Sequence, residues 1–126
     1  MSTKADTRTF EKYNWNELAK EVVRPGVTRC GFGGDDVLLV MNWLEPGMTV
    51  NPHSHPFEQL VYIVKGTARF HIGDDVVTAG PGDIIRIPPD VMHYAEPVGS
   101  ETVLNLDVFS PIRDDYRHLM DYQQKK

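Results

Sequence analysis

A series of turn signals at short, regular intervals limits what this chain can fold into more than any other feature. The turns are rich in glycine, proline and acidic residues: GFGGDD (31–36), EPG (45–47), KG (65–66), GDD (73–75), AGPGD (79–83), PPD (88–90) and VGSE (98–101). Between them lie short apolar, β-branched runs: VLLVMNWL (37–44), QLVYIV (59–64), ARFHI (68–72), DIIRIP (83–88) and TVLNLDVF (102–109). Short strands at this spacing are typical of an all-β sandwich or barrel. No run of helical length separates them, which argues against parallel βαβ units.

Helix signals are confined to the two ends of the chain. Near the N-terminus, Asn14 is followed three residues later by Glu17, the pattern of a capping box. The helix that these residues begin should be short, because Arg-Pro-Gly at 24–26 ends it.

A second helix is expected after Ser110 and Pro111, which have the character of an N-cap and a first helical residue. Tyr116, Leu119 and Met120 fall on one face of that helix. This apolar face is expected to dock on the barrel.

Length and charge narrow the class of protein further. A chain of 126 residues predicts one domain over residues 1–126, with a barrel core at about 27–110. The net charge of -5, with basic residues scattered, argues against nucleic acid as a partner. No apolar stretch approaches the roughly 20 residues that span a membrane. The start, MSTKADTRTF, lacks the apolar run of a signal peptide, and Cys30 is the one cysteine, so we expect a cytoplasmic protein.

The stretch NPHSHPFEQ (51–59) is the first candidate for a site with chemistry. Side chains on a strand alternate between faces, so His53 and His55 point to the same side. Gln59 shares their parity, and Glu58 does so only if the strand changes register at Pro56.

A third histidine, His93, follows a strand and a proline turn in GDIIRIPPDVMH (82–93). Three imidazoles and one amide oxygen suit a divalent Zn, Ni, Fe or Mn ion. His71 and His118 lack partners at ligand spacing and are expected on solvated faces.

Both stretches resemble the motifs of the cupin superfamily. The run Gly47-x5-His53-x-His55-x3-Gln59-x6-Gly66 is similar to the first motif, with glutamine at its acidic position. The run Gly82-x5-Pro88-x-Asp90-x2-His93 is similar to the second, with Asp90 in place of glycine and Pro97 in place of asparagine. The resemblance implies a double-stranded β-helix, the cupin jelly-roll barrel. It also implies that one metal ion is bound by the equivalent residues, which are His53, His55, Gln59 and His93.

The glutamine has chemical consequences. A glutamate ligand would cancel one unit of the metal's charge, whereas four neutral ligands leave a divalent ion its full charge. Such a site polarises a bound carbonyl or water more strongly and favours an anionic substrate. The alternative, with Glu58 as fourth ligand, requires a register change at Pro56; otherwise Glu58 is a surface carboxylate or one that orients a histidine.

The strand at 102–109 has two different faces, and the sequence leaves open which one is inside. Leu104, Leu106 and Val108 form one face, while Asn105, Asp107 and Phe109 form the other. Packing the apolar face inward would leave Asp107 solvated. A cupin pocket, however, is lined by inward side chains, and a barrel covered by a helix or a partner also carries apolar residues outside.

The run Asp107-x-Phe109-x3-Arg113 resembles the tail of the small pectin-degradation cupins. Those proteins convert 4,5-unsaturated monouronates to linear keto-uronates, and the resemblance implies a lyase or isomerase. Asp107 would move the proton, Arg113 would bind the substrate carboxylate, and Phe109 would shape the wall. Arg113 could instead lie on the helix surface and pair with Asp114 or Glu101.

Two other functions remain open, a cupin dioxygenase and a non-catalytic module that binds a sugar or small ligand. Arg86, which alternates with Ile85 and Ile87, reaches either the pocket or the solvent. We expect a homodimer, because the apolar strand faces exceed what one small barrel buries and small cupins commonly pair through their sheets.

Overall fold

The computed structural model describes residues 9–124 of the chain. The start of the sequence, on which the cytoplasmic prediction partly depends, therefore lies mostly outside the described residues, as do both ends of the expected domain. The elements in chain order are η1 (Trp15–Glu17), β1 (Glu21–Arg24), β2 (Val27–Gly33), β3 (Leu38–Leu44), β4 (Gln59–Lys65), β5 (Ala68–Ile72), β6 (Asp75–Ala79), β7 (Ile84–Ile87), β8 (His93–Pro97), β9 (Val103–Phe109) and η2 (Asp114–Gln124).

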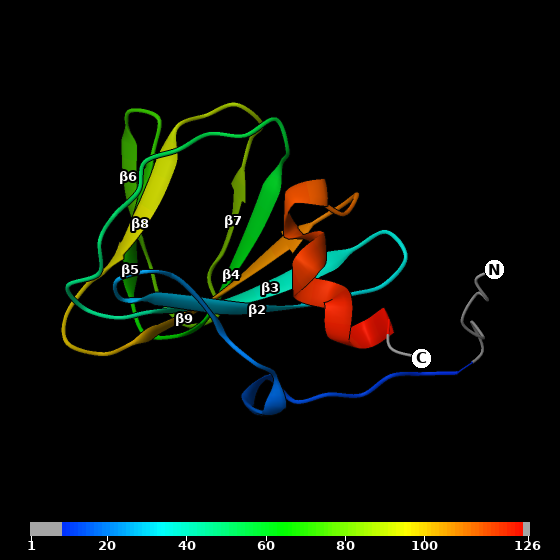
Figure 1. The fold of residues 1–126 in the computed structure, drawn as a ribbon. Helices are drawn as coiled ribbons and strands as arrows, with labels where there is room; N and C mark the ends of the chain where they lie inside the picture. Colours follow the sequence, from blue (N-terminus) through cyan, green and yellow to red (C-terminus); the bar gives the residue numbers. More distant parts are fainter. Residues whose placement is uncertain (1–8, 125–126) are drawn as a thin grey trace.

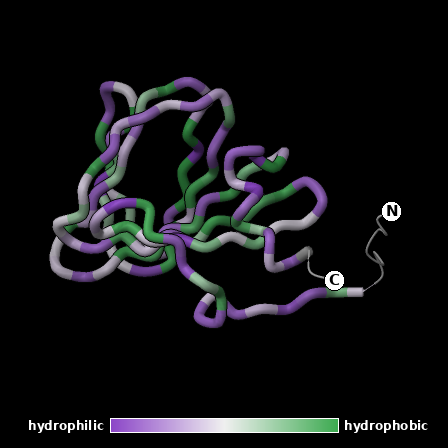
Figure 2. Tube along the Cα trace, viewed as in Figure 1, coloured by the Kyte–Doolittle hydropathy of each residue, from purple (hydrophilic) through white to green (hydrophobic). Residues whose placement is uncertain are grey.

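The strands form two antiparallel sheets. The larger has the order β1-β2-β3-β9-β4-β7, and the smaller has the order β6-β5-β8. Figure 1 shows the smaller sheet standing opposite β4 and β7, while the helix η2 lies across β2 and β3. This arrangement is that of a jelly roll, so the all-β prediction is confirmed. In Figure 2 hydrophobic stretches of the tube lie along the strands, interrupted by hydrophilic residues, and many of the turns are hydrophilic.

The main core lies between the two sheets. Along β4 the burial alternates, with Val61 and Ile63 buried and Leu60 and Tyr62 exposed. Inward residues of both sheets and Met48 of the loop after β3 complete this core: Val27, Leu44, Met48, Ala68, Phe70, Ala79, Ile87 and Val103. The period of two in the sequence thus matches the face that each strand turns inward.

On β9 the mixed face is the inner one. Val103, Asn105 and Phe109 are buried, whereas Leu104, Leu106 and Val108 are only partly so. The simpler interpretation, in which the leucines pack inside and Asp107 is solvated, is therefore wrong. Each odd-numbered residue of β9 pairs with an inward residue of β3, as Asp107 does with Val40, so the register of the sheet sets the parity.

The helix predictions hold in part. Asn14 and Glu17 form the expected capping box, but η1 ends at Glu17 and strand β1 begins at Glu21. The C-terminal helix begins at Asp114, later than the expected start after Ser110 and Pro111. The helical elements are 3-10 rather than α-helical.

The apolar face of η2 docks on the barrel as predicted. Leu119 and Met120 are buried in a second core with Leu38 and Phe109. A Cβ atom added to Gly31 would lie 2.8 Å from Leu119 Cβ. The helix can approach β2 this closely because glycine occupies the contact. Among residues 9–124, no helix is long and apolar enough to cross a membrane.

We predict that Gly31→Ala lowers the free energy of unfolding by about 1–3 kcal/mol, because the added methyl forces η2 away from β2. Gly34→Ala is the matched control, since an added Cβ there meets nothing within 4 Å. Chemical denaturation of both variants checks the prediction. Equal stability of the two would show that η2 does not depend on this contact.

Candidate metal centre

Backbone pairing brings the two histidine segments together. His53 N–H donates to the carbonyl of His93 at 3.1 Å, and His93 N–H donates back at 2.8 Å. Asp90 N–H donates to the carbonyl of His55 at 2.7 Å. Asp90 has a φ of 67°, the left-handed region that favours glycine, which explains why the cupin motif has glycine there. As a result, one ring nitrogen from each of His53, His55 and His93 lies within 4.8 Å of the others.

The tautomer of each histidine follows from a backbone contact. The Nδ1 atoms of His53, His55 and His93 lie 2.7, 2.9 and 2.8 Å from backbone carbonyls two residues away. A carbonyl oxygen only accepts, so each Nδ1 carries the proton and each Nε2 keeps a free lone pair. Burial lowers the pKa of His53 and of His93, which keeps these imidazoles neutral. Neutral imidazoles with a free nitrogen are the form that binds a metal.

Gln59 completes the set. Its Oε1 lies 3.2 Å from Nε2 of His55 and 3.2 Å from Nε2 of His93. With both Nδ1 atoms protonated, these contacts bring acceptors together with no proton between them. A cation relieves that repulsion, so the donor set fits a divalent metal ion.

Glu58 lies on the other side of β4. Its carboxylate accepts from Arg86 Nε at 2.7 Å, and both side chains are exposed. The strand therefore keeps its register after Pro56, and the structure does not place Glu58 among the ligands. Arg86 likewise faces the solvent rather than the pocket.

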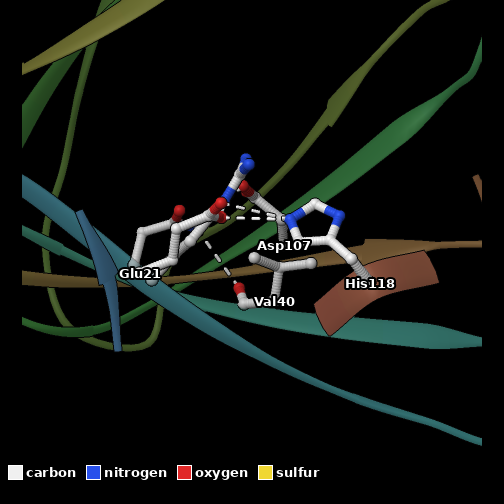
Figure 3. A network of polar contacts seen from close by, with 6 residues as sticks. Glu21, Val40, Asp107 and His118 are labelled. Atoms are coloured by element: carbon white, nitrogen blue, oxygen red, sulfur yellow. Dashed lines mark hydrogen bonds and ion pairs between the residues drawn. The ribbon is translucent and has the colours of Figure 1, made fainter. Parts of the chain in front are cut away.

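The amide group of Gln59 is held by Asp107. Gln59 Nε2 donates to Asp107 Oδ1 at 2.8 Å, which turns the amide oxygen toward the histidines. Asn105 donates to the same oxygen at 2.9 Å, and Asn42 donates to Oδ2 at 3.0 Å. Figure 3 shows Asp107 above Val40, whose carbonyl also accepts from Asn42. Burial raises the pKa of Asp107 to about 6, although the amide donors oppose the shift.

Asn42 and Asn105 were missed by the sequence analysis as functional residues. They sit opposite each other on β3 and β9, and Asn105 Oδ1 is a buried atom without a hydrogen-bond partner in the described part of the chain. An isolated asparagine in an otherwise apolar strand such as VLLVMNWL is the signal that could have drawn attention to them. A buried amide needs a partner, and here the partner is Asp107.

A small cavity of about 110 Å³ opens beside these ligands. Its wall includes His53, Gln59, His93 and Asp107, together with Phe109 and Arg113. The residues named from the sequence thus meet at one cavity, although His55 is not part of its lining. Arg24 and Arg29 also line it, and the sequence analysis gave neither a role.

Arg113 is buried rather than on the helix surface. Its guanidinium donates twice to Asp115, from Nε at 3.0 Å and from Nη2 at 2.7 Å. It lies 3.8 Å from the ring centre of Tyr116 and 4.8 Å from that of Phe109. The alternative pairing with Asp114 or Glu101 does not occur; Asp114 pairs with Arg117, and Glu101 with Lys65.

The other histidines lie away from the centre. His71 is half-buried, stacks on Tyr94 at 4.2 Å and lies 2.6 Å from the carboxylate of Glu96. His118 is exposed on η2 and contacts Glu21, as Figure 3 shows. Glu21 also accepts from Arg29 at 2.7 Å.

Comparisons with known proteins agree with this geometry. The sequence model of one family, described as Cupin domain, matches residues 43–109. The structure of KdgF from Halomonas sp. is similar, with a TM-score of 0.71 and 29% identity over 79% of this chain and 94% of that one. An RmlC-like cupin from Shewanella frigidimarina shares the fold, with a TM-score of 0.75 and 23% identity over 86% of this chain and 96% of that one.

A curated relative matches a shorter stretch. Gentisate 1,2-dioxygenase of Haloferax sp is 34% identical over 56 residues, which are 44% of this chain and 16% of the dioxygenase. The match therefore spans a minor part of that enzyme.

We predict that metal-loaded protein holds one divalent ion per chain, and that His53→Ala or His93→Ala weakens metal affinity at least about 10-fold because each removes a ligand. His71→Ala is the control, since it removes an imidazole outside the cluster. Elemental analysis and competition with a chelator measure the effect. Unchanged affinity in both ligand variants would contradict the assignment.

Proposed function

This chain belongs to the family described as Cupin domain, and from that premise we propose that it is a metal-dependent lyase or isomerase. Its substrate is a 4,5-unsaturated monouronate or a similar small acid, which it converts to the linear keto form. The observation that carries the proposal is the 2.8 Å hydrogen bond from Gln59 to Asp107, because it links an acid–base carboxylate to a neutral ligand set. The resemblance of the Asp107–Arg113 run to the tail of the pectin-degradation cupins supports the choice of substrate, and the likeness to KdgF from Halomonas sp. supports the comparison with small cupins.

The ligand residues would hold one divalent ion through three imidazole Nε2 atoms and Gln59 Oε1. A bound ion supplies Lewis-acid polarisation of a substrate oxygen. Because all four ligands are neutral, none of them cancels the positive charge of a bound ion. A carboxylate substrate is therefore favoured over a neutral sugar.

Asp107 is the proposed acid–base group. Its Oδ1 accepts two amide donors, whereas Oδ2 accepts one, from Asn42. Oδ2 is thus the oxygen with room for a proton. Burial raises the pKa of this carboxyl group to about 6, which suits a group that takes up and returns a proton near neutral pH.

Phe109 and Arg113 form the wall beside this group. Phe109 is buried and its ring lies 6.1 Å from that of His55, so it limits the space next to the ligands. Arg113 adds positive charge to the same wall, although Asp115 balances part of it. We assign substrate contact to both residues.

The direct test is turnover. Metal-loaded protein should speed the loss of the near-ultraviolet absorbance of an unsaturated monouronate relative to buffer with the same metal. Failure to do so, with zinc, nickel, iron and manganese each tried, would remove the uronate assignment. It would leave the family and the ligand set untouched.

A dioxygenase is the second candidate, and the match to the Haloferax dioxygenase favours it. Oxygen uptake separates the two reactions, because a uronate lyase or isomerase consumes none. Iron-loaded protein that takes up oxygen with gentisate, and leaves unsaturated uronates unchanged, would establish this alternative.

We predict that Asp107→Asn lowers kcat by roughly 100-fold or more while the protein keeps its metal. The asparagine Oδ1 can still accept from Gln59, so the ligand stays oriented but the proton acceptor is lost. Asp107→Leu should lose activity and also weaken metal affinity about 10-fold, because Gln59 is then released. Wild-type kcat in Asp107→Asn would rule out the proton-transfer role.

We also propose that the protein is a homodimer that pairs through the outer face of β4 and β7. On this face Leu60, Tyr62 and Ile84 are 42%, 41% and 78% exposed. They form one apolar surface, on which Val108 also lies. A surface of this kind on a strand edge commonly marks an interface.

Light scattering should give twice the chain mass of 14.3 kDa for the wild type. Ile84→Lys should shift the protein to the single-chain mass, because it puts a charge in the apolar face. Val76→Lys, on β6 of the other sheet, should leave the dimer intact. A single-chain mass for the wild type over a wide concentration range would exclude the dimer.

A further inference from the structure

Three arginines line the cavity, and they differ in whether a carboxylate pairs with the guanidinium. Arg29 donates to Glu21 at 2.7 Å, and Arg113 makes two hydrogen bonds to Asp115. Arg24 has no ion pair within residues 9–124; its Nε donates to the backbone carbonyl of Thr49 at 2.7 Å. Arg24 is therefore the cavity-lining guanidinium that pairs with no carboxylate in the described part of the chain.

The backbone around Arg24 is held firmly. Arg24 ends β1 and precedes the Pro25–Gly26 turn. Thr49 N–H donates to the carbonyl of Pro25 at 3.1 Å, and Glu45 N–H donates to that of Gly26 at 2.9 Å. A Cβ at Gly26, where φ is +83°, would lie 2.7 Å from the Cα of Met48. The turn is thus packed against the loop that leads to His53, which fixes the position of the arginine.

The guanidinium of Arg24 has more hydrogen-bond donors than its bond to Thr49 uses. The bond to Thr49 uses Nε, so the edge formed by the two terminal Nη atoms is available. That edge matches the two oxygens of a carboxylate. Arg24 is half-buried, which makes it accessible from the cavity yet partly shielded from water. Its charge also acts on His53, so it lies near the ligand face.

We propose that Arg24, in the wall of the cavity, binds the carboxylate of the substrate, so that the site selects hydroxy acids over neutral sugars. The proposal rests on the function proposed above, and it names the residue that gives that site its preference for acids. Arg113, whose charge Asp115 balances, contributes less to this preference. The sequence analysis treated Arg24 only as part of a signal that ends a helix.

Binding of a non-reacting ligand tests this assignment without any need for turnover. Titration calorimetry with metal-loaded protein would compare saturated galacturonate, which carries the carboxylate, with galactose, which does not. Wild-type protein should prefer galacturonate at least 10-fold. Arg24→Gln should remove most of that preference and leave the weak binding of galactose unchanged, whereas Arg24→Lys should restore part of it.

Arg117→Gln is the matched control. It removes the same charge from the chain, but on the exposed surface of η2, where Arg117 pairs with Asp114. It should leave the preference intact, which separates a local contact from a general effect of net charge. Metal content of the Arg24 variants should equal that of the wild type, and the melting temperature should fall only by the small amount expected for loss of the hydrogen bond to Thr49.

Three results would overturn the assignment. The first is a wild-type protein that does not distinguish galacturonate from galactose. The second is an Arg24→Gln variant that keeps the preference. The third is an equal loss for both ligands, which indicates damage to the cavity. Turnover of the unsaturated uronate is measured separately, so an inactive protein that still selects the acid through Arg24 would refute the reaction and retain this inference.

Discussion

The amide of Gln59 is the interaction on which the rest of the centre depends. Its oxygen faces two imidazole nitrogens at 3.2 Å, and its nitrogen donates to Asp107 at 2.8 Å. A carboxylate at this position would bring a second negative charge next to Asp107 and could not donate to it. The neutral amide donates to Asp107 through its nitrogen and offers its oxygen to a metal ion together with the imidazoles. It leaves the ligand set without charge.

The cavity brings a carboxyl group, neutral imidazoles and arginines together in a small volume. Burial disfavours the charged form of each group. It therefore raises the pKa of Asp107 and lowers the pKa of His53 and of His93. Amide donors stabilise the carboxylate without adding charge of their own. The positive charge at the rim comes from arginines held by carboxylates outside the cavity, with Arg24 as the exception.

The sequence predicted those features that depend on the alternation of apolar residues and on the spacing of motifs. The strands at 38–44, 59–65 and 68–72 appear where apolar runs lie between turns, and the spacing of His53, His55 and Gln59 placed them on one face. Strands β1, β2, β6 and β8 were missed because glycine, charge or proline dilutes their apolar pattern. The inward face of β9 was not decidable, because pairing with β3 and β4 sets it. Asn42 and Arg24 reach the cavity through contacts distant in sequence, which local patterns do not encode.

Each imidazole of the three-histidine cluster is oriented by a carbonyl oxygen of its own segment, two residues away. Every amino acid supplies such an oxygen. For this task, the side chains at positions 51, 57 and 91 are therefore free to vary. Many substitutions in the surrounding loops would leave the orientation of the imidazoles unchanged. The centre can therefore persist in distant relatives that have little sequence identity. Conservation of the centre requires only a few side chains and the same main-chain conformation.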